Sequence, residues 1–517
     1  MKYIKSALKT AYDIFPFLNR PMAVCAIISI FSILFLYKYE NTATSLLILF
    51  AIVSVVLSAI TRDKKVLFIS VCALAVCASA VNEFMTVRDL EQFDGQVVKA
   101  DFIAIEDSFD TGKVSRVTVF CTDKNQVLNK SKFSFHYFFD EKIYSGDCFR
   151  AEVELSSLEG SEYKNYNFGN SVYMDCRLLK IDKYYSPNSF FKTIGNIKRY
   201  MINTLKEKFP KDISSILIAL NCGDSRYLSN DFYTKVKICG VSHIMVVSGL
   251  HISIIIGLLF GVFEKYYYNR YLKTVISVFV ISGICAICGF TLSSVRAGIM
   301  FMFFVISPVL MRRNDALNSL GSAIVLILFL SPFSIFSTGF QLSVAATLSV
   351  VWISPFYSDL ICKKLLVRKK PAMSAVSVFV VSVCAMIFTA PITIYTFGTF
   401  SILSPITFIL ITVPVTVALS SNTLALIISS IKGISVLSEP IFILAGLCIR
   451  YIKFIIDNLG ILDFMLVKAG TISMIIFLLI ILILIFGMYL YKYYIKLRKR
   501  QLLSEVKSNG GHIRKRA

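Results

Sequence analysis

Residues 471–491 read TISMIIFLLIILILIFGMYLY and contain no charged side chain. An α-helix needs about 20 apolar residues to cross a bilayer, so this stretch predicts a membrane-spanning helix. Over the whole chain, 56% of the 517 residues are hydrophobic and 17% are charged, whereas about 25% are charged in soluble domains. Further apolar runs occupy 21–37, 43–60, 66–82, 274–291 and 374–397. The sequence therefore predicts a polytopic α-helical membrane protein.

The net charge of +22 is unevenly distributed. Residues 83–190 hold 13 Lys and Arg against 18 Asp and Glu, so they carry −5 and the rest of the chain carries +27. The positive charge lies in short stretches between apolar runs and in the segment from Lys492 to Arg516. Because short basic loops mark the cytoplasmic side of a membrane, we interpret this charge as topology and not as a nucleic-acid-binding surface.

Span counting predicts about 12 spans in a multi-pass protein of the cell membrane. With a cytoplasmic N-terminus, three spans place residues 83–187 outside, and nine more return the C-terminus to the cytoplasm. Pro405 and Pro414 predict that the long run 402–431 is broken into two pieces. The nine later spans are roughly 241–263, 274–291, 296–311, 317–336, 339–357, 374–397, 402–431, 435–457 and 471–492.

The polar region 83–187 alternates between apolar and polar residues. Five such stretches, separated by turn residues, predict short strands in a small extracellular barrel or sandwich. A five-stranded barrel of the OB type is one option. The stretches are 96–105, 115–121, 133–139, 148–155 and 172–181.

Two helical segments follow the β region. Residues 190–209 place apolar side chains at helical spacing among lysines and Arg199, which predicts a basic amphipathic helix at the membrane surface. Residues 213–222 are apolar but too short to span, so we expect a re-entrant or buried segment. The resulting domains are 1–82 (three spans), 83–187 (β domain), 188–240 (surface helix and short segment), 241–492 (multi-span block) and 493–517 (basic tail).

Several polar residues stand at membrane depth, where such groups usually face the bundle interior or a water-filled path. They are His243, Ser248, His251, Arg296, Gln341 and Asn422. For Arg296, both a helix cap and a polar path stay open, and for Gln341 an interhelical hydrogen bond is favoured. On an unbroken helix, His243 and His251 would lie about 12 Å apart, so we expect no shared metal ion and no cofactor.

The Ser248–Gly249 pair beside two histidines has the composition of an intramembrane serine protease. His251 lies only three residues beyond Ser248, which is poor geometry for a base, so we expect no enzymatic activity. The pair is expected to bend the helix instead. Whether the two histidines bind neighbouring helices or serve function stays open from their chemistry alone.

Three of the 13 cysteines fall in the external region: Cys121, Cys148 and Cys176. An oxidising exterior permits one disulfide there. If strands 148–155 and 172–181 are antiparallel, Cys148 comes near Cys176, and we predict that pair.

The segment LNCGDSRYLSNDFYTKVKICGVSHIMVVSGLHISIIIGLL (220–259) resembles the hallmark of ComEC-type competence channels. Further motifs of that family follow in the same order along the chain. The matching residues are Gly223, Asp224, Gly240, Ser242, His243, Ser248, Gly249, Leu250, His251, Arg296, Ala297, Gly298, Arg313, Asp315, Asn318, Pro332, Gly339, Phe340, Gln341, Leu342, Ser343, Pro391, Tyr395, Phe397, Gly398, Ser404 and Pro405.

The resemblance implies a channel that passes single-stranded DNA across the cytoplasmic membrane during natural transformation, with an OB-like domain that handles DNA outside. We expect His243 to lock helices and His251 to line the path. The implied channel residues are Asp224, Ser242, His243, Ser248, Gly249, His251, Arg296, Gln341, Tyr395 and Pro405.

The resemblance also implies partners besides membrane lipid. The sequence has no GxxxxGK[ST] phosphate loop, so we expect a separate cytoplasmic ATPase or helicase, together with a surface DNA receptor. Many family members end in a metallo-β-lactamase-like nuclease domain. Residues 493–517 contain only His512 of the histidines which that domain needs, so we expect the form of the family that lacks this domain. A separate nuclease is then an open possibility.

An acidic external domain attracts a polyanion poorly, so aromatic stacking is the expected mode of DNA contact. The candidates are Phe133, Phe135 and Tyr137, with Phe138 beside them. Two other functions stay open. One is a transporter or flippase for another polyanionic or lipid-linked substrate, and the other is an intramembrane hydrolase at Ser248.

Overall fold

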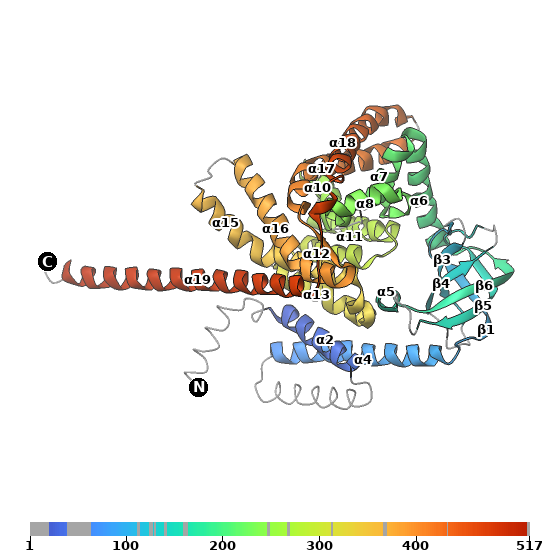
Figure 1. The fold of residues 1–517 in the computed structure, drawn as a ribbon, viewed down its shortest axis with the longest axis horizontal. Coiled ribbons are helices and arrows are strands. Elements are labelled where there is room, and N and C mark those ends of the chain that lie inside the picture. The colour runs from blue at the N-terminus through green and yellow to red at the C-terminus, as the bar shows by residue number, and fades with distance from the viewer. Residues whose placement is uncertain are drawn as a thin grey trace.

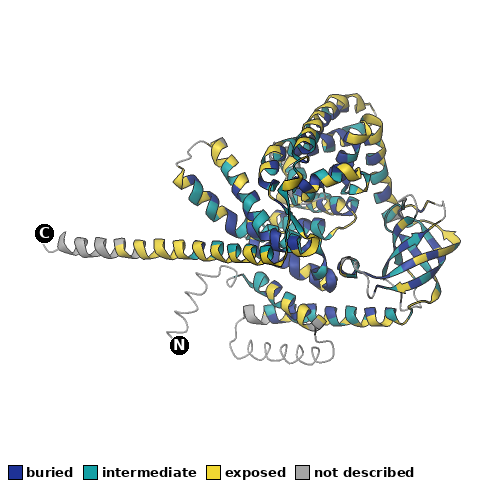
Figure 2. Cartoon of the chain, in the orientation of Figure 1, coloured by how far each residue is buried: buried dark blue, intermediate teal, exposed yellow. Residues whose placement is uncertain are grey.

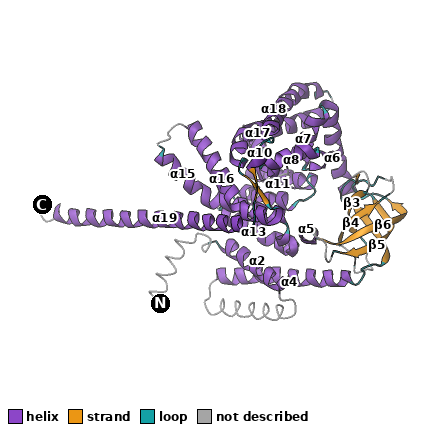
Figure 3. Cartoon of the chain, in the orientation of Figure 1, coloured by secondary structure: helices purple, strands orange, loops and turns teal. Residues whose placement is uncertain are grey.

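The alternating region between the apolar runs folds into a β domain, which lies at one end of the longest axis of a helical body (Figure 1). Figure 3 shows the strands concentrated in this domain, with one further short pair inside the helical body. The computed structural model describes residues 20–38, 64–110, 114–123, 128, 131–138, 142–158, 164–245, 249–265, 269–311, 314–365, 370–431 and 433–513.

The β domain is a closed barrel. Strand β1 pairs with both β5 and β3, which closes the sheet, and β4 runs parallel to β6 while the other pairs are antiparallel. The five predicted strands are confirmed, and the closed order β1-β3-β4-β6-β5 fits an OB-like barrel and not a sandwich. The strands are β1 (Val97–Ala104), β2 (Phe109–Asp110), β3 (Ser115–Cys121), β4 (Lys132–Tyr137), β5 (Cys148–Ser157) and β6 (Val172–Tyr185).

The helical body is built from segments before and after the barrel. Helices α2 (Pro21–Lys38) and α4 (Lys64–Glu91) precede it, and the predicted span 43–60 lies among residues that are not described. The others are α5 (Lys164–Gly169), α6 (Ser189–Lys208), α7 (Lys211–Cys222), η2 (Ser225–Tyr227), α8 (Asn230–Ile238), α9 (Ser242–Met245), α10 (Gly249–Lys265), α11 (Arg270–Ile287), α12 (Leu292–Ile306), α13 (Ala316–Leu330), η3 (Pro332–Phe336), α14 (Thr338–Leu348), η4 (Ser349–Ile353), α15 (Ser354–Lys364), α16 (Lys370–Phe397), α17 (Ser404–Ser429), η5 (Ser435–Leu437), α18 (Ser438–Leu459), η6 (Asp463–Met465) and α19 (Thr471–Ile513). The short strand pair is β7 (Thr399–Ser401) with β8 (Leu466–Lys468).

Two sequence predictions for the helices are confirmed and one is wrong. The amphipathic helix forms as α6, where the Asn188 side chain accepts hydrogen bonds from the first backbone N–H groups; its place at the membrane surface stays a prediction. The short apolar segment forms α7, a mostly buried helix. The run 402–431 is not broken, because α17 continues through Pro414. Pro405 lies in its first turn, where the missing N–H costs no hydrogen bond.

Six helices of the described residues are long and apolar enough to cross a membrane. In one of them, a π-helical turn (η4) joins α14 to α15 just before Pro355, whose missing N–H disturbs the regular ladder. The larger count of about 12 spans stays a prediction. The six are Phe68–Glu91, Arg270–Ile287, Thr338–Lys364, Ala372–Phe397, Ser404–Ser429 and Thr471–Arg498, and shorter apolar helices cover Pro21–Phe35, Leu292–Ile306 and Ala316–Leu330.

The barrel is attached to the helical body by its hydrophobic core. Val87 and Leu90, at the end of α4, and Phe333 of η3 belong to the same buried cluster as the barrel interior. The Phe333 ring lies 5.7 Å from Phe168 and 5.8 Å from Tyr173, measured between ring centroids. Figure 2 shows this buried interior, in contrast to α19, which is exposed along most of its described length.

Helix α2 docks on α13 through two of the motif residues, Asp315 and Asn318. The Arg20 Nε donates to Asp315 Oδ1 at 2.6 Å, and the Met22 backbone N–H donates to Asn318 Oδ1 at 3.1 Å. One turn further along, a Cβ on Gly321 would lie 2.5 Å from the backbone of Met22. The glycine therefore permits α2 and α13 to touch backbone to backbone.

We expect Gly321→Ala to destabilise the protein and Gly257→Ala to stabilise it slightly. In a helix, Gly→Ala ordinarily adds about 0.5–1 kcal/mol of stability, and a Cβ on Gly257 would meet no atom within 4 Å. At Gly321 the two helices must separate instead, which costs about 1–3 kcal/mol. Thermal unfolding of both variants in detergent measures the difference, and equal shifts in the same direction would contradict the contact.

Candidate functional site

The Gly-Asp pair of the motif segment, Gly223 and Asp224, builds a buried ion cluster. Gly223 ends α7 with a positive φ of 69°, and the Asp224 side chain, only 4% exposed, accepts from the Arg226 N–H at the start of η2. Arg226 also donates Nε to Oδ1 at 2.8 Å and Nη2 to Oδ2 at 2.7 Å. The Lys198 ammonium of α6 lies 3.2 Å from Oδ2. Asp224 thus ties α6 to the loop after α7.

The same cluster reaches the β domain. The Arg226 Nη2 lies 3.5 Å from Glu106 Oε2, and its guanidinium sits over the Phe109 ring at 5.0 Å from the centroid. One residue along α6, Arg199 Nη1 donates to Asp107 Oδ1 at 2.9 Å. We call Glu106, Asp107, Lys198, Arg199, Asp224 and Arg226 the ionic junction.

The charge state of Asp224 follows from this junction. Burial alone would raise the pKa of its carboxyl, but the hydrogen bonds from Arg226 and the charges of Lys198 and Arg226 outweigh burial and lower the pKa to about 2. The carboxylate is therefore ionised throughout the physiological pH range.

The next motif glycine allows a close approach between distant segments. Gly240 has a φ of +69°, and a Cβ there would lie 2.7 Å from Ser404 and 2.8 Å from Ser401. The Ser401 Oγ donates to the Ile238 carbonyl at 2.5 Å, and the Ser404 Oγ donates to the Gly240 carbonyl at 3.1 Å. The buried Pro405 follows in the first turn of α17. Residues about 160 positions apart in the sequence thus form one joint.

The two motif histidines have different surroundings. His243, which follows the partly exposed Ser242 on α9, is exposed and stacks on Phe408 of α17 with ring centroids 5.9 Å apart. His251 lies on α10 and is only 1% exposed. Gly249 begins α10, and Ser248 lies among residues that are not described. The contact with Phe408 connects α9 to α17, and the role of His243 in locking helices stays a prediction.

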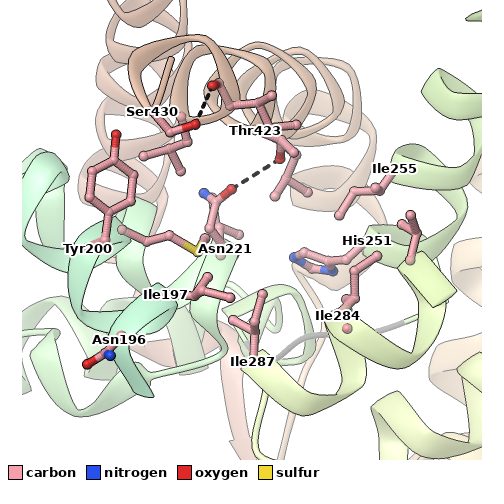
Figure 4. Close-up of a pocket in the computed structure, with 17 residues that line it drawn as sticks. Asn196, Ile197, Tyr200, Asn221, His251, Ile255, Ile284, Ile287, Thr423 and Ser430 are labelled. Carbon is pink, nitrogen blue, oxygen red and sulfur yellow. Dashed lines mark hydrogen bonds between the residues drawn. The ribbon is translucent and has the colours of Figure 1, made fainter. Parts of the chain in front are cut away.

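His251 lines a cavity of about 580 Å³ between α6, α7, α10, α11 and α17. In Figure 4 its ring is turned into the cavity. Thr423 of α17 donates to Asn221 Oδ1 of α7 at 3.4 Å inside the cavity. The lining residues are Asn196, Ile197, Tyr200, Met201, Leu220, Asn221, His251, Ile255, Val280, Gly283, Ile284, Ile287, Leu419, Thr423, Leu426, Ile427 and Ser430. Because the lining contains no charged side chain and is mostly aliphatic, the cavity is not suited to the DNA backbone.

Three consecutive motif residues of α12 contact three different helices. The buried Arg296 donates Nε to Ser343 Oγ at 2.7 Å and Nη1 to Thr347 Oγ1 at 2.5 Å, both on α14. Ala297 faces α10, with its Cβ 3.7 Å from a Cβ built on Gly249. A Cβ on Gly298 would lie 2.8 Å from Cys285 Sγ of α11. Of the two readings open from the sequence, the helix cap is wrong, because the guanidinium crosses between helices.

Two further motif residues, Gln341 and Tyr395, form no hydrogen bond between long helices in the part of the chain that the structure describes. The Gln341 Nε2 donates to the Ile335 carbonyl of η3 at 2.9 Å, which is a contact with the preceding turn and not the expected bond to another long helix. Tyr395, near the end of α16, is 83% exposed. Its role in a channel stays a prediction.

The predicted DNA-stacking set is wrong. Phe133, Phe135 and Tyr137 are at most 1% exposed and fill the barrel interior, where Phe135 packs edge-on against Phe102 at 4.7 Å. Strand alternation puts these three residues on the inner face of β4. Phe138, which ends this segment, is 66% exposed.

The predicted disulfide is also wrong. Strands β5 and β6 are antiparallel as expected, but Cys148 lies opposite Tyr185 and Cys176 opposite Leu155. The two cysteines are therefore at different positions along the ladder, and both are free.

Sequence reasoning missed most of the ionic junction. Glu106 and Asp107 follow the first strand, and Lys198 and Arg199 stand on the polar side of α6, so neither pair has a diagnostic spacing. The available signal was an acidic pair just after a strand and a basic pair in the middle of an amphipathic helix. The pairing itself depends on how the barrel sits on α6.

The motif segment lies in a region that is similar to known proteins. The Competence protein family matches residues 220–493, which contain most of the motif residues described above. ComE operon protein 3 of Bacillus subtilis (strain 168) is 23% identical over 243 residues, which is 47% of this chain. The aligned part is 30% of that relative's length, and no solved structure matches the chain.

We expect Asp224→Asn to lower the free energy of unfolding by about 1–3 kcal/mol, because it leaves Lys198 and Arg226 without their shared counter-ion. Asp231→Asn is the matched control, since the Asp231 side chain is 78% exposed and pairs with Lys235 at the surface. Denaturant or thermal unfolding in detergent measures both. Equal effects would mean that the junction does not depend on Asp224.

The difference in unfolding free energy between the native protein and Asp224→Asn should depend on pH. A carboxyl whose pKa is lower in the folded state adds stability above its unfolded pKa, near 4, and loses it as the pH falls toward 2. The stability gap between the native protein and Asp224→Asn should therefore be constant from about pH 7 to 5 and shrink below about pH 4. A gap that does not change down to pH 3 would contradict the lowered pKa.

Proposed function

The chain belongs to the competence protein family, and from that premise we propose that it passes single-stranded DNA across the cytoplasmic membrane during natural transformation. Family membership and the likeness to ComE operon protein 3 support a role in DNA uptake in competence. The observation that carries the proposal is the contact between the OB-like barrel and the motif segment. Arg226, in the matched region 220–493, pairs with Glu106 just after barrel strand β1, as part of the ionic junction. We propose that the chain is a conduit and not an enzyme.

The proposed topology has the β domain outside the cell and both termini in the cytoplasm. In Figure 1 the barrel lies at one end of the longest axis, and α19 runs toward the other end. The described end of α19 carries Lys492, Lys496 and Arg498, in agreement with the preference for positive charge on the cytoplasmic side.

The proposed DNA-contacting face of the barrel includes Phe138 and the exposed end of β6. The Arg177 guanidinium lies 5.5 Å from the Phe138 ring centroid, and the Lys183 ammonium lies 5.5 Å from the Tyr185 ring centroid. Tyr184, between Lys183 and Tyr185, points to the other side of β6, where its ring packs on Phe149. Exposed rings next to cations suit stacking on bases and contact with phosphates, and they do so locally although the region as a whole is acidic.

The partners proposed for this function are a surface receptor that delivers DNA and a cytoplasmic ATPase or helicase that pulls it. A separate nuclease that degrades the second strand is compatible with the same path. The chain itself then supplies only the passage.

The direct test is uptake of labelled transforming DNA by a strain that lacks the gene. Complementation with the native gene should restore uptake, and uptake that is unchanged by the deletion would remove the channel proposal in favour of a transporter of another substrate. The membrane level of the protein is measured in every strain.

We expect Arg296→Ala to lower transformation by about tenfold or more in that strain, because a buried cation in a membrane domain usually serves a polar path. The double variant Ser343→Ala/Thr347→Val is the matched control, since it breaks the same bonds between α12 and α14 but keeps the charge. Equal losses in the two variants would mean that Arg296 only joins helices.

We expect Phe138→Ala to weaken binding of a fluorescent single-stranded oligonucleotide by about tenfold, since stacking is worth about 1–3 kcal/mol per base. The protein in lipid nanodiscs is titrated with the oligonucleotide. Tyr271→Ala removes another exposed ring, at the start of α11, and should leave affinity unchanged. Undiminished affinity in Phe138→Ala would place the DNA contact elsewhere.

A further inference from the structure

The cavity beside His251 has an apolar interior. Its wall is formed largely by aliphatic side chains, among them Leu220 of α7, Ile284 and Ile287 of α11 and Leu419 of α17. The Asn221 amide inside it donates to the Leu217 carbonyl at 2.9 Å and accepts from Thr423 at 3.4 Å, so these polar atoms are satisfied by the protein. Such an interior favours a hydrocarbon ligand over a charged or strongly hydrated one.

The cavity is continuous with surfaces that face lipid. Helices α11 and α17, which form two of its walls, are both long and apolar enough to cross the membrane. Next to the lining residues they expose Phe279 (79%) and Leu424 (47%), and Ile427 of the lining is itself 56% exposed. In a bilayer such side chains contact acyl chains, so the cavity is reached from the hydrocarbon region.

The rim of the cavity is polar where α17 ends. Exposed Asn196 and Tyr200 of α6 and exposed Ser430, just beyond α17, lie on this rim. The Tyr200 hydroxyl bonds to the Ser429 hydroxyl at 2.9 Å and bridges the two helices there. Figure 4 shows Tyr200 and Ser430 on one side of the cavity and Ile284 and Ile287 on another. A polar rim at a helix end above an aliphatic interior matches the ester region and acyl chain of a membrane lipid.

We propose that this cavity binds one acyl chain of a membrane phospholipid, with the ester region of the lipid at the rim formed by Asn196, Tyr200 and Ser430. The bound chain packs against His251 and Asn221 and fills the space between α6, α11 and α17. The proposal does not depend on DNA passage, because it uses only the shape, polarity and membrane exposure of the cavity.

The test uses the full chain reconstituted in vesicles of phosphatidylethanolamine and phosphatidylglycerol, with a small fraction of phosphatidylglycerol that carries a diazirine in one acyl chain. After photolysis, mass spectrometry maps crosslinks. We expect crosslinks in residues 280–287 and 419–430. Gly283→Leu should lower them by about tenfold, because Gly283 lines the cavity and a Cβ there meets no atom within 4 Å, so a leucine can occupy cavity space.

Three comparisons keep the test decisive. Gly257→Leu adds the same side chain in open space on α10 and should leave the crosslinks unchanged. Ser430→Phe obstructs the rim instead of the interior and should give the same loss as Gly283→Leu. Crosslinks on the exposed face of α19 serve as the internal standard in every sample. Cavity crosslinks that keep their ratio to α19 in both variants would overturn the proposal, as would photoactivatable single-stranded DNA that crosslinks to 280–287.

Discussion

The carboxylate of Asp224 is the constraint on which the arrangement of the β domain and the motif segment depends. A buried charge is costly unless it is paired and hydrogen-bonded, and the partners of Asp224 come from two places, Lys198 on α6 and Arg226 in η2. Arg226 and Arg199 then engage Glu106 and Asp107 at the exit of strand β1. The pairing therefore sets where α6 runs, and α6 in turn provides one attachment of the barrel. Another attachment is apolar, through Phe333 and the end of α4.

The remaining motif residues are mainly places where helices approach one another closely. Gly240 lets the turn before α9 touch Ser401 and Ser404, and Gly298 lets α12 touch α11. Arg296 differs from these residues because it places a cation in the bundle with neutral hydroxyl partners. In a membrane, where apolar side chains gain little from leaving lipid, small residues and buried polar bonds specify which helices meet. The motifs thus encode contacts between helices.

The sequence predicted those features that depend on local periodicity. Alternation located five barrel strands to within four residues of their observed ends, and helical spacing located α6. Features that depend on register or on distant neighbours were not predictable. Phe133, Phe135 and Tyr137 lie on the side of β4 that faces the barrel core. The register between β5 and β6 places Cys148 and Cys176 at different positions along the two strands. Proline composition also misled, because α17 tolerates Pro414 without a break. The ionic junction joins residues more than 90 positions apart, as in Arg199 and Asp107, and no short motif records such a pairing.

Hydrogen–deuterium exchange of the native protein and Asp224→Asn in lipid nanodiscs tests most directly whether Asp224 holds the β domain on the motif segment. The account predicts that peptides covering 104–109, 196–208 and 224–228 are protected in the native protein and lose protection together in the variant. Peptides from the barrel core, such as 149–155, should keep theirs, because their hydrogen bonds lie within the sheet. Loss of protection confined to 224–228, with the other two segments unchanged, would contradict the central role of this carboxylate.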